Sequence, residues 1–477
     1  MQFNRKLELA TDLYQLSMGN VYYEEGKADQ IAVFDAFIRN NPFGGGYTVA
    51  CGLAQIIEYI KGLSFDEADI DQLRTNHPEF TEGFLNYLRH FKFNGEIYAV
   101  PEGTIIFPYE PIVRVKAPLI QAQLVETTIL SIINHQTLIA TKAARIVEEA
   151  GEDVVMEFGL RRAHGTEAGY FGARAAFIGG FTGTSVVETE PMLGRPSMGT
   201  MAHSFIQSYD SELEAFEAYA KYNPQNATLL VDTYNTLEQG VPNAIKVLKK
   251  MKDAGELTGI YGIRIDSGDL AYMTATARKM LDEAGLPEAL ICASSDLDEY
   301  LIKDLKAQGA RINSWGIGTK LITAYDCPSL GGVYKMAQID DKPKIKISGD
   351  PWKITNPGEK KIYRLYSKNN DMMLADLLCL SGETIDESEP LTIFHPMHPW
   401  KKRTIKDFYA KELLVPVFEN GVCVYDEPAI AEIKAHMEDE KARLWPTFKR
   451  IINPHVYHVD LSQALWDLKQ QLLDACN

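Results

Sequence analysis

Between Asp153 and Lys320 the sequence alternates short apolar runs with helical patterns, and this alternation is the strongest constraint on the fold. The apolar runs are VVMEFG, TSVVE, ATLLVDTY, GIYGIRIDSGD, LICASSD and INSWGIGTK, and segments with apolar residues at helical spacing separate them. One strand and one helix together take about 30 to 40 residues, the length of a βα unit. We therefore expect an α/β fold around a parallel sheet, either open or closed into a barrel.

The chain of 477 residues divides into three predicted segments. Residues 1–150 mix short strands with helices and end in a long helical pattern, which indicates an N-terminal α/β domain with a mixed sheet. Residues 151–335 carry the βα alternation and are expected to form the catalytic domain. In residues 336–477 the alternation ends, and we expect a C-terminal extension that packs on the other two segments.

Charge and composition exclude several classes of function. A net charge of −17 disfavours binding to nucleic acids or anionic membranes. The sequence has no apolar run of roughly 18 residues and no secretory leader, so we expect a cytoplasmic protein. Its cysteines are dispersed without a C-x-x-C pair, and no histidine spacing matches a zinc motif, which disfavours a disulfide scaffold or structural zinc.

Polar side chains follow six consecutive predicted strands. In a βα architecture these positions share one face, at the carboxyl ends of the strands, where ligands bind. The sequence therefore predicts a site built from several strand ends. The residues are Arg161 and Arg162; Thr184 and Ser185; Asp232, Thr233, Tyr234 and Asn235; Arg264, Asp266, Ser267 and Asp269; Ser294, Ser295 and Asp296; and Gly316, Gly318, Thr319 and Lys320.

Two of these strand ends indicate a phosphorylated ligand. The Gly316-x-Gly318-Thr319 turn offers backbone N–H groups and a hydroxyl to a terminal phosphate. Arg264 beside Asp266 and Asp269 suits an anion next to a Mg²⁺-bound polyphosphate. Neither a Walker A loop nor a G-x-G-x-x-G turn is present, so a P-loop or Rossmann nucleotide site is disfavoured.

Each of these residues also has an ordinary structural interpretation. Arg161 could pair with acids on the surface, Asp266 could cap the helix expected from Leu270, and GIGTK could be a simple turn. His203 presents the same choice. It lies in GTMAHS without apolar periodicity, as either an incidental turn residue or a ligand contact.

Seven motifs occur in the order found in nicotinate phosphoribosyltransferases: TDLYQLSM, FGLRRA, GTS, GTMAHS, VDTYN, RIDSGD and GIGTKL. The chain closely resembles this family from residue 11 to at least Lys361. The resemblance implies an irregular α/β barrel of the type II phosphoribosyltransferase kind and a cytoplasmic homodimer with a shared active site. The implied reaction joins nicotinate to 5-phosphoribosyl 1-diphosphate and gives nicotinate mononucleotide and diphosphate, coupled to ATP hydrolysis with Mg²⁺, as the first step of NAD salvage from nicotinate.

The resemblance also implies a role for each matching residue. His203 is transiently phosphorylated by ATP, and imidazole is chemically suited to that step. The pyridine ring stacks between Phe158 and the Tyr14 of a partner subunit. The remaining implied roles are contact with nicotinate for Arg264 and Thr200, binding of the 5-phosphate for Gly316, Gly318 and Thr319, a position near the diphosphate or the ring for Arg161, and the ribose or Mg²⁺ for Asp266, with Asp269 also near Mg²⁺.

Three alternatives remain open at this point. The chain could use nicotinamide or quinolinate instead, or it could be a ligand-binding relative without activity. The related nicotinamide enzyme carries an acid after its Gly-Thr, suited to accept from the amide NH₂. That position is Ser185 here, and a neutral hydroxyl favours nicotinate.

Overall fold

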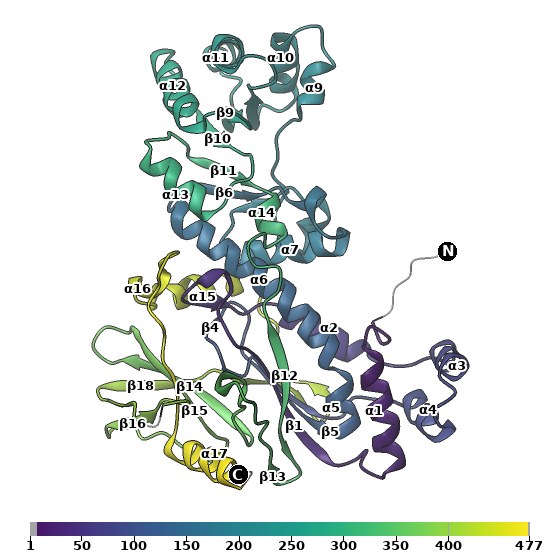
Figure 1. Ribbon diagram of the computed structural model, residues 1–477. Helices are drawn as coiled ribbons and strands as arrows, with labels where there is room; N and C mark the ends of the chain where they lie inside the picture. Colours follow the sequence, from purple (N-terminus) through teal and green to yellow (C-terminus); the bar gives the residue numbers. More distant parts are fainter. Residues whose placement is uncertain (1–6, 399, 476–477) are drawn as a thin grey trace. The chain divides into compact units, whose positions relative to one another are not determined.

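The computed structural model describes residues 7–398 and 400–475 (Figure 1). Contacts group the chain into two compact units. Residues 139–328 form what we call the central unit, and residues 1–138 together with 329–477 form the terminal unit. The first and third predicted segments therefore share one unit, and helix α6 (Glu126–Ala150) continues from the terminal unit into the central unit.

The central unit is built on a six-stranded sheet in the order β7-β6-β11-β10-β9-β8. All five ladders in it are parallel, as the βα alternation predicts. Among the described residues no ladder joins the edge strands β7 and β8, so the curled sheet is an open half-barrel. Its strands are β6 (Val154–Glu157), β7 (Gly183–Thr184), β8 (Asn226–Leu230), β9 (Ile260–Ile265), β10 (Leu290–Ala293) and β11 (Ser314–Ile317).

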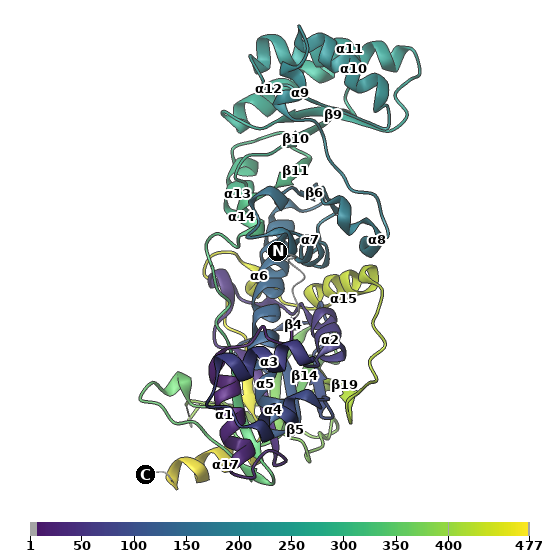
Figure 2. The same ribbon diagram turned by 90° about the vertical axis from the view of Figure 1, so that its right-hand side faces the viewer.

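Helices follow the strands of the central unit and cover one face of its sheet. Figure 2 shows α10, α11 and α12 side by side next to β9. The core between these layers is apolar, and Leu229, Ile263 and Ile291 are completely buried in it. The helical elements are η2 (Leu160–Arg162), α7 (Thr166–Ile178), η3 (Val187–Thr189), α8 (Glu190–Leu193), α9 (His203–Gln207), α10 (Glu212–Tyr222), the π-helical turn η4 (Thr236–Gly240), α11 (Val241–Asp253), α12 (Leu270–Glu283), α13 (Glu299–Ala307) and α14 (Thr319–Ile322).

Helix α12 begins at Leu270, as predicted, but its cap differs from the one considered from the sequence. Asp269 is the N-cap, and its carboxylate accepts the Tyr272 N–H at 3.0 Å. Side-chain caps of this kind satisfy an N–H that has no partner within the helix. Asp266, the residue considered for this cap, is engaged elsewhere.

The main sheet of the terminal unit contains strands from both the N-terminal and the C-terminal parts of the chain. Strand β1 (Ile31–Ile38) pairs with β12 (Gly332–Ile339) and with β5 (Val113–Pro118), in both cases antiparallel. The sheet has seven strands in the order β13-β12-β1-β5-β3-β19-β20. The other strands are β3 (Glu96–Ala99), β13 (Lys342–Pro343), β19 (Val415–Glu419) and β20 (Val422–Cys423).

A second six-stranded sheet, β17-β16-β21-β15-β14-β18, comes entirely from the C-terminal segment, and β2 pairs with β4 separately. These strands are β2 (Thr48–Val49), β4 (Ile105–Ile106), β14 (Lys360–Ser367), β15 (Met373–Leu380), β16 (Leu391–Phe394), β17 (Lys402–Ile405), β18 (Phe408–Glu412) and β21 (Val459–Leu461). The helices of the unit are α1 (Leu13–Glu24), η1 (Pro42–Gly44), α2 (Leu53–Gly62), α3 (Glu67–Asn76), α4 (Glu82–Arg89), α5 (Leu119–Leu124), η5 (Pro351–Lys353), α15 (Ile430–Ala442), α16 (Pro446–Lys449) and α17 (Gln463–Asp474). Within residues 7–398 and 400–475, no helix has both the length and the apolar character to cross a membrane.

Candidate active site

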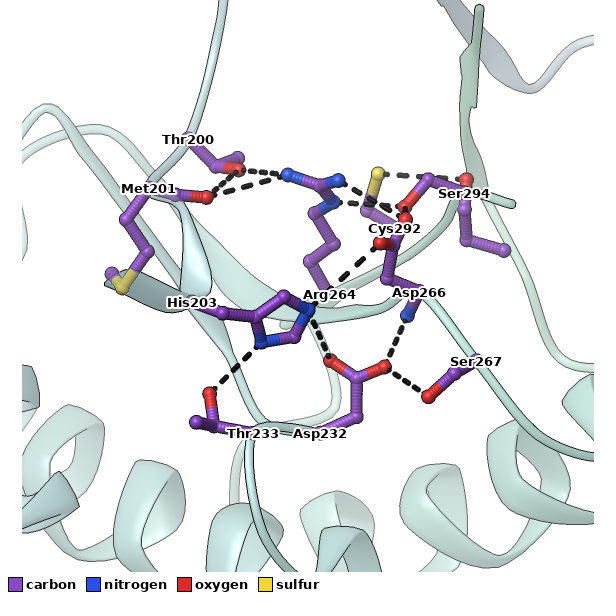
Figure 3. Close-up of polar contacts among 11 residues, drawn as sticks. Thr200, Met201, His203, Asp232, Thr233, Arg264, Asp266, Ser267, Cys292 and Ser294 are labelled. Carbon is purple, nitrogen blue, oxygen red and sulfur yellow. Dashed lines mark hydrogen bonds and ion pairs between the residues drawn. The ribbon is translucent and has the colours of Figure 1, made fainter. Parts of the chain in front are cut away.

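The guanidinium of Arg264 is the centre of a polar network at the carboxyl ends of β8, β9 and β10 (Figure 3). Its Nε donates to Ser294 Oγ at 2.9 Å, and Nη1 donates to Thr200 Oγ1 at 2.9 Å. Its Nη2 donates to Asp266 Oδ1 at 3.1 Å. The Arg264 side chain is 15% exposed, so these three oxygens fix the orientation of a nearly buried fork of donors.

Two aspartates connect the ends of β8 and β9. The buried Asp232 accepts the Asp266 N–H at 2.8 Å and the Ser267 hydroxyl at 2.7 Å through the same Oδ2 atom. Asp266 in turn accepts from both Arg264 and Ser294 through Oδ1. Its position is therefore set by its backbone as well as by its side chain.

His203, the first residue of α9, faces this pair of carboxylates. Its Nδ1 lies 3.0 Å from Thr233 Oγ1. Its Nε2 lies 3.9 Å from Asp232 Oδ1 and 3.9 Å from Asp266 Oδ2. The Thr233 hydroxyl holds the imidazole through Nδ1. The imidazole is 40% exposed, so a ligand can still reach it. The structure thus brings together four of the sequence-predicted residues, which are Thr200, His203, Arg264 and Asp266.

The Gly316-x-Gly318-Thr319 turn joins the end of β11 to the start of α14. A Cβ on Gly316 would approach the Phe158 ring to 2.7 Å, so only glycine allows this ring to lie against the strand end. The same ring lies 5.9 Å from Arg264 Cζ, measured to its centroid. Phe158 therefore contacts the turn on one side and approaches the guanidinium on the other.

Lys320, which follows this turn, is already engaged. Its Nζ donates to Asp298 Oδ2 at 2.6 Å, while Asp298 Oδ1 caps α13 through the Leu301 N–H. Burial raises the pKa of the Asp298 carboxyl, but these two hydrogen bonds outweigh burial and hold it below its usual value. Lys320 thus fixes the turn to α13.

The loop after β10 is strained next to the Arg264 network. Ser295 (φ 104°) and Asp296 (φ 41°) adopt the left-handed region although neither is glycine. Such conformations cost about 1–3 kcal/mol each and cluster at functional sites. The loop directly follows Ser294, whose hydroxyl both accepts from Arg264 and donates to Asp266.

Besides Phe158 and the Gly316-x-Gly318-Thr319 turn, four predicted site residues lie outside this hydrogen-bonded network. Arg161 is exposed in η2, and Asp269 is exposed as the cap of α12. Ser185 is half-buried after β7, and its N–H donates to Glu157 O at 3.0 Å. Tyr14 belongs to α1 of the terminal unit and is 48% exposed.

The network also contains three of the predicted strand-end residues to which the sequence assigned no individual role. Asp232, Thr233 and Ser294 follow predicted strands, so their strand-end positions were the available signal. Glu157 gave no such signal because it lies inside an apolar run, yet its completely buried carboxylate binds the loop that follows β6 and the end of β7. Among the described residues no group of three His, Cys, Asp or Glu side chains is placed to hold a metal ion.

Comparison with known proteins gives one consistent result. Three family models match: the nicotinate phosphoribosyltransferase N-terminal domain at residues 9–134, the family itself at 154–375 and the C-terminal domain at 359–469. Nicotinate phosphoribosyltransferase of Bacillus subtilis is 46% identical over 469 residues, covering 98% of this chain and 95% of the relative.

Solved structures agree with this result. The crystal structure of human nicotinic acid phosphoribosyltransferase superimposes with a TM-score of 0.86 at 29% identity, covering 97% of this chain and 99% of that one. Nicotinate-nucleotide pyrophosphorylase from Pyrococcus furiosus has a TM-score of 0.72 at 21% identity and covers 93% of this chain and 98% of that one, which supports the fold.

Asp232→Ala should release the end of β9. The Asp266 N–H would lose its acceptor, and an unpaired buried donor costs about 1–3 kcal/mol. We expect a lower melting temperature and faster hydrogen exchange in a peptide spanning 264–269. Asp253→Ala, at the exposed end of α11, is the control and should change neither. Unchanged exchange at 264–269 in Asp232→Ala would show that Asp232 does not hold this strand end.

Proposed function

The chain belongs to the nicotinate phosphoribosyltransferase family, and from this we propose how its strand-end site joins nicotinate to 5-phosphoribosyl 1-diphosphate. The observation that supports the proposal most directly is the Arg264 guanidinium, held by Thr200, Ser294 and Asp266 beside the Phe158 ring. A fixed guanidinium next to an aromatic face suits a planar ring that carries a carboxylate.

In this proposal nicotinate lies with its ring against Phe158 and its carboxylate toward Arg264 and Thr200. The Gly316-x-Gly318-Thr319 turn binds the 5-phosphate of the second substrate through backbone N–H groups and the Thr319 hydroxyl. The exposed Arg161 is assigned to the diphosphate. Because 5-phosphoribosyl 1-diphosphate is anionic and the chain carries −17 net charge, binding has to depend on these local cations and dipoles.

The reaction forms one bond and breaks one. The pyridine nitrogen attacks the anomeric carbon of the ribose, and the bond from that carbon to the diphosphate oxygen breaks, with its electron pair leaving on diphosphate. The ring nitrogen carries no proton, so the site needs no general base for this step. The residues contribute by positioning the reactants and by stabilising charge as the oxocarbenium-like transition state forms.

Mg²⁺ fits the carboxylates at the end of β9 as a partner shared with the diphosphate. Asp266 Oδ1 is occupied by Arg264 and Ser294, which leaves Oδ2 toward the open side near His203. Asp269 uses Oδ1 to cap α12 and has a second oxygen to offer. Mg²⁺ in proteins usually keeps several waters and binds one or two carboxylates together with substrate phosphates. An ion held by Asp266 and Asp269 would therefore neutralise charge on the leaving diphosphate.

We also assign the ATP coupling to His203. An imidazole nitrogen attacks the terminal phosphorus of ATP, the bond to ADP breaks, and water later hydrolyses the phosphoramidate to phosphate. Thr233 fixes the ring through Nδ1, and the carboxylates of Asp232 and Asp266 stabilise positive charge on it. The exposed imidazole and the small neighbours Gly199 and Ala202 leave room for a polyphosphate.

A homodimer in the cytoplasm completes the proposal. Tyr14 is 48% exposed on α1, and Leu13 and Val21 of the same helix are 50% and 56% exposed. Apolar side chains grouped on one helix favour a protein contact. In the dimer, Tyr14 of one subunit stacks on the nicotinate bound by the other. Use of nicotinamide or quinolinate and a silent, ligand-binding relative are the disfavoured alternatives. The matched family, the Bacillus subtilis relative and the human structure are all named for nicotinate or nicotinic acid.

His203→Ala should separate phosphoribosyl transfer from ATP hydrolysis. With nicotinate, 5-phosphoribosyl 1-diphosphate, ATP and Mg²⁺, the unaltered protein should form nicotinate mononucleotide and incorporate acid-labile phosphate from ATP. The variant should lose the incorporation and the stimulation by ATP, yet keep slow uncoupled transfer, since Arg264 and the phosphate turn remain.

His164→Ala is the matched control, because this exposed histidine of the central unit should leave both activities unchanged. Phosphate incorporation that persists in His203→Ala would refute the assignment of His203. Absence of nicotinate mononucleotide with the unaltered protein would refute the proposed reaction itself.

Ser185→Asp should weaken the preference for nicotinate. A carboxylate at this position would repel the nicotinate carboxylate and accept from the amide of nicotinamide. We expect the ratio of kcat/KM for nicotinate to that for nicotinamide to fall about tenfold or more, a change of about 1.4 kcal/mol. Ser208→Asp, on an exposed residue after α9, adds the same charge and should leave the ratio unchanged. Equal ratios in the two variants would place Ser185 away from the ring.

A further inference from the structure

Glu157, the last residue of β6, carries a completely buried carboxylate between the loop that follows β6 and the end of β7. Its Oε1 accepts the N–H of Gly159, and its Oε2 accepts the Thr184 hydroxyl at 2.5 Å. Both partners are neutral. Burial raises the pKa of this carboxyl although both hydrogen bonds act to lower it.

The two segments that Glu157 connects are the loop after β6 and the end of β7, and each leads to a predicted contact of the pyridine ring. Phe158 lies between Glu157 and Gly159, so the carboxylate holds the loop on which the ring-stacking residue is placed. Thr184 directly precedes Ser185, the residue assigned to selectivity. Glu157 also holds Ser185 through its backbone, because Glu157 O accepts the Ser185 N–H at 3.0 Å.

The packing around this carboxylate leaves little freedom. A Cβ on Gly159 would lie 2.8 Å from Glu157 Oε1 and 2.6 Å from Ile322 Cβ, so the loop can approach the carboxylate only with glycine there. On the other side, the Thr184 hydroxyl accepts the Val186 N–H at 3.1 Å, which continues the network along the loop.

Stability alone does not account for an acid at this position. A buried carboxyl group costs free energy unless its hydrogen bonds compensate for the loss of water, and an apolar side chain at the end of β6 would avoid that cost. The β6–β7 ladder already pairs Glu157 with Thr184 through the backbone. What the carboxylate adds is a link from the Thr184 side chain to the Gly159 N–H, which holds the loop that carries Phe158 against the end of β7.

We propose that Glu157 is a positioning residue that sets the spacing between Phe158 and Ser185, and thereby the affinity for nicotinate and its discrimination from nicotinamide. The proposal rests on the roles assigned above to Phe158 and Ser185. Glu157 itself does not touch the substrate. Its effect should therefore appear in the binding of the pyridine substrate and spare the binding of 5-phosphoribosyl 1-diphosphate at the Gly316-x-Gly318-Thr319 turn.

Steady-state kinetics of Glu157→Ala, Thr184→Val and the double variant test this inference. Glu157→Ala should raise the KM for nicotinate about tenfold and change the KM for 5-phosphoribosyl 1-diphosphate less than about twofold, since a small displacement of a positioning group is costly. Thr184→Val should have a smaller effect in the same direction. The double variant should raise the nicotinate KM no more than Glu157→Ala does, because both changes remove the hydrogen bond between Glu157 and Thr184. The acceptor of the Val186 N–H, which only Thr184→Val removes, should affect the melting temperature.

Glu157→Gln should recover most of the nicotinate affinity. Its amide oxygen can accept the Gly159 N–H while its NH₂ donates to the Thr184 hydroxyl oxygen, so the spacing is kept without the charge. Glu212→Ala is the matched control: this glutamate is equally buried in the central unit, but it accepts from Asn243 at 2.9 Å and lies at the start of α10. It should lower the melting temperature and leave both KM values unchanged.

Several outcomes would overturn the inference. These are an unchanged nicotinate KM in Glu157→Ala, a parallel rise of both KM values, or additive effects of the two single variants. If Glu157→Ala does not fold, Thr184→Val and Glu157→Gln still decide the question through the nicotinate KM and the nicotinate-to-nicotinamide ratio. Phe158→Leu distinguishes failure of the proposed ring contact from failure of the role of Glu157. An unchanged nicotinate KM in Phe158→Leu refutes the ring contact. A raised nicotinate KM in Phe158→Leu together with an unchanged nicotinate KM in Glu157→Ala refutes only the role of Glu157.

Discussion

The fixed guanidinium of Arg264 is the interaction on which the rest of the site depends. An arginine at the end of a parallel strand could turn toward solvent, but here Thr200, Ser294 and Asp266 each occupy one of its nitrogens. These oxygens come from three different segments of the central unit. The orientation of the Arg264 side chain therefore depends on the positions of all three segments. A charged donor held in this way can bind an anion without first being reorganised.

The carboxylates of Asp232 and Asp266 connect Arg264 to the end of β9 and to His203. Asp232 holds the end of β9 through the Asp266 N–H, and the same two aspartates face His203 from 3.9 Å. The proposed phosphorylation of His203 and the proposed binding of nicotinate by Arg264 therefore share Asp266. This common residue offers a physical route by which ATP hydrolysis and phosphoribosyl transfer can influence each other, because a change at either group alters the charge next to the other.

Much of this arrangement follows from local patterns, while the remainder depends on contacts between distant residues. Helix α12 begins at Leu270, where the sequence predicts it, and the polar residues after β8, β9 and β10 converge. The pairing of β1 with β12 was not predicted, because the paired residues are about 300 positions apart and the periodicity of neither segment indicates its partner. Glu157 was missed because a buried acid inside an apolar run looks like one more strand residue, and only its two hydrogen bonds reveal what it holds.

The most direct test of the central claim is a crystal structure of the protein with nicotinate bound. The account predicts the nicotinate carboxylate within hydrogen-bonding distance of Arg264, about 2.7–2.9 Å from its nitrogens, with the pyridine ring against Phe158. Nicotinate bound with its carboxylate on Arg161 or at another site, with Arg264 contacting only Thr200, Ser294 and Asp266, would contradict it.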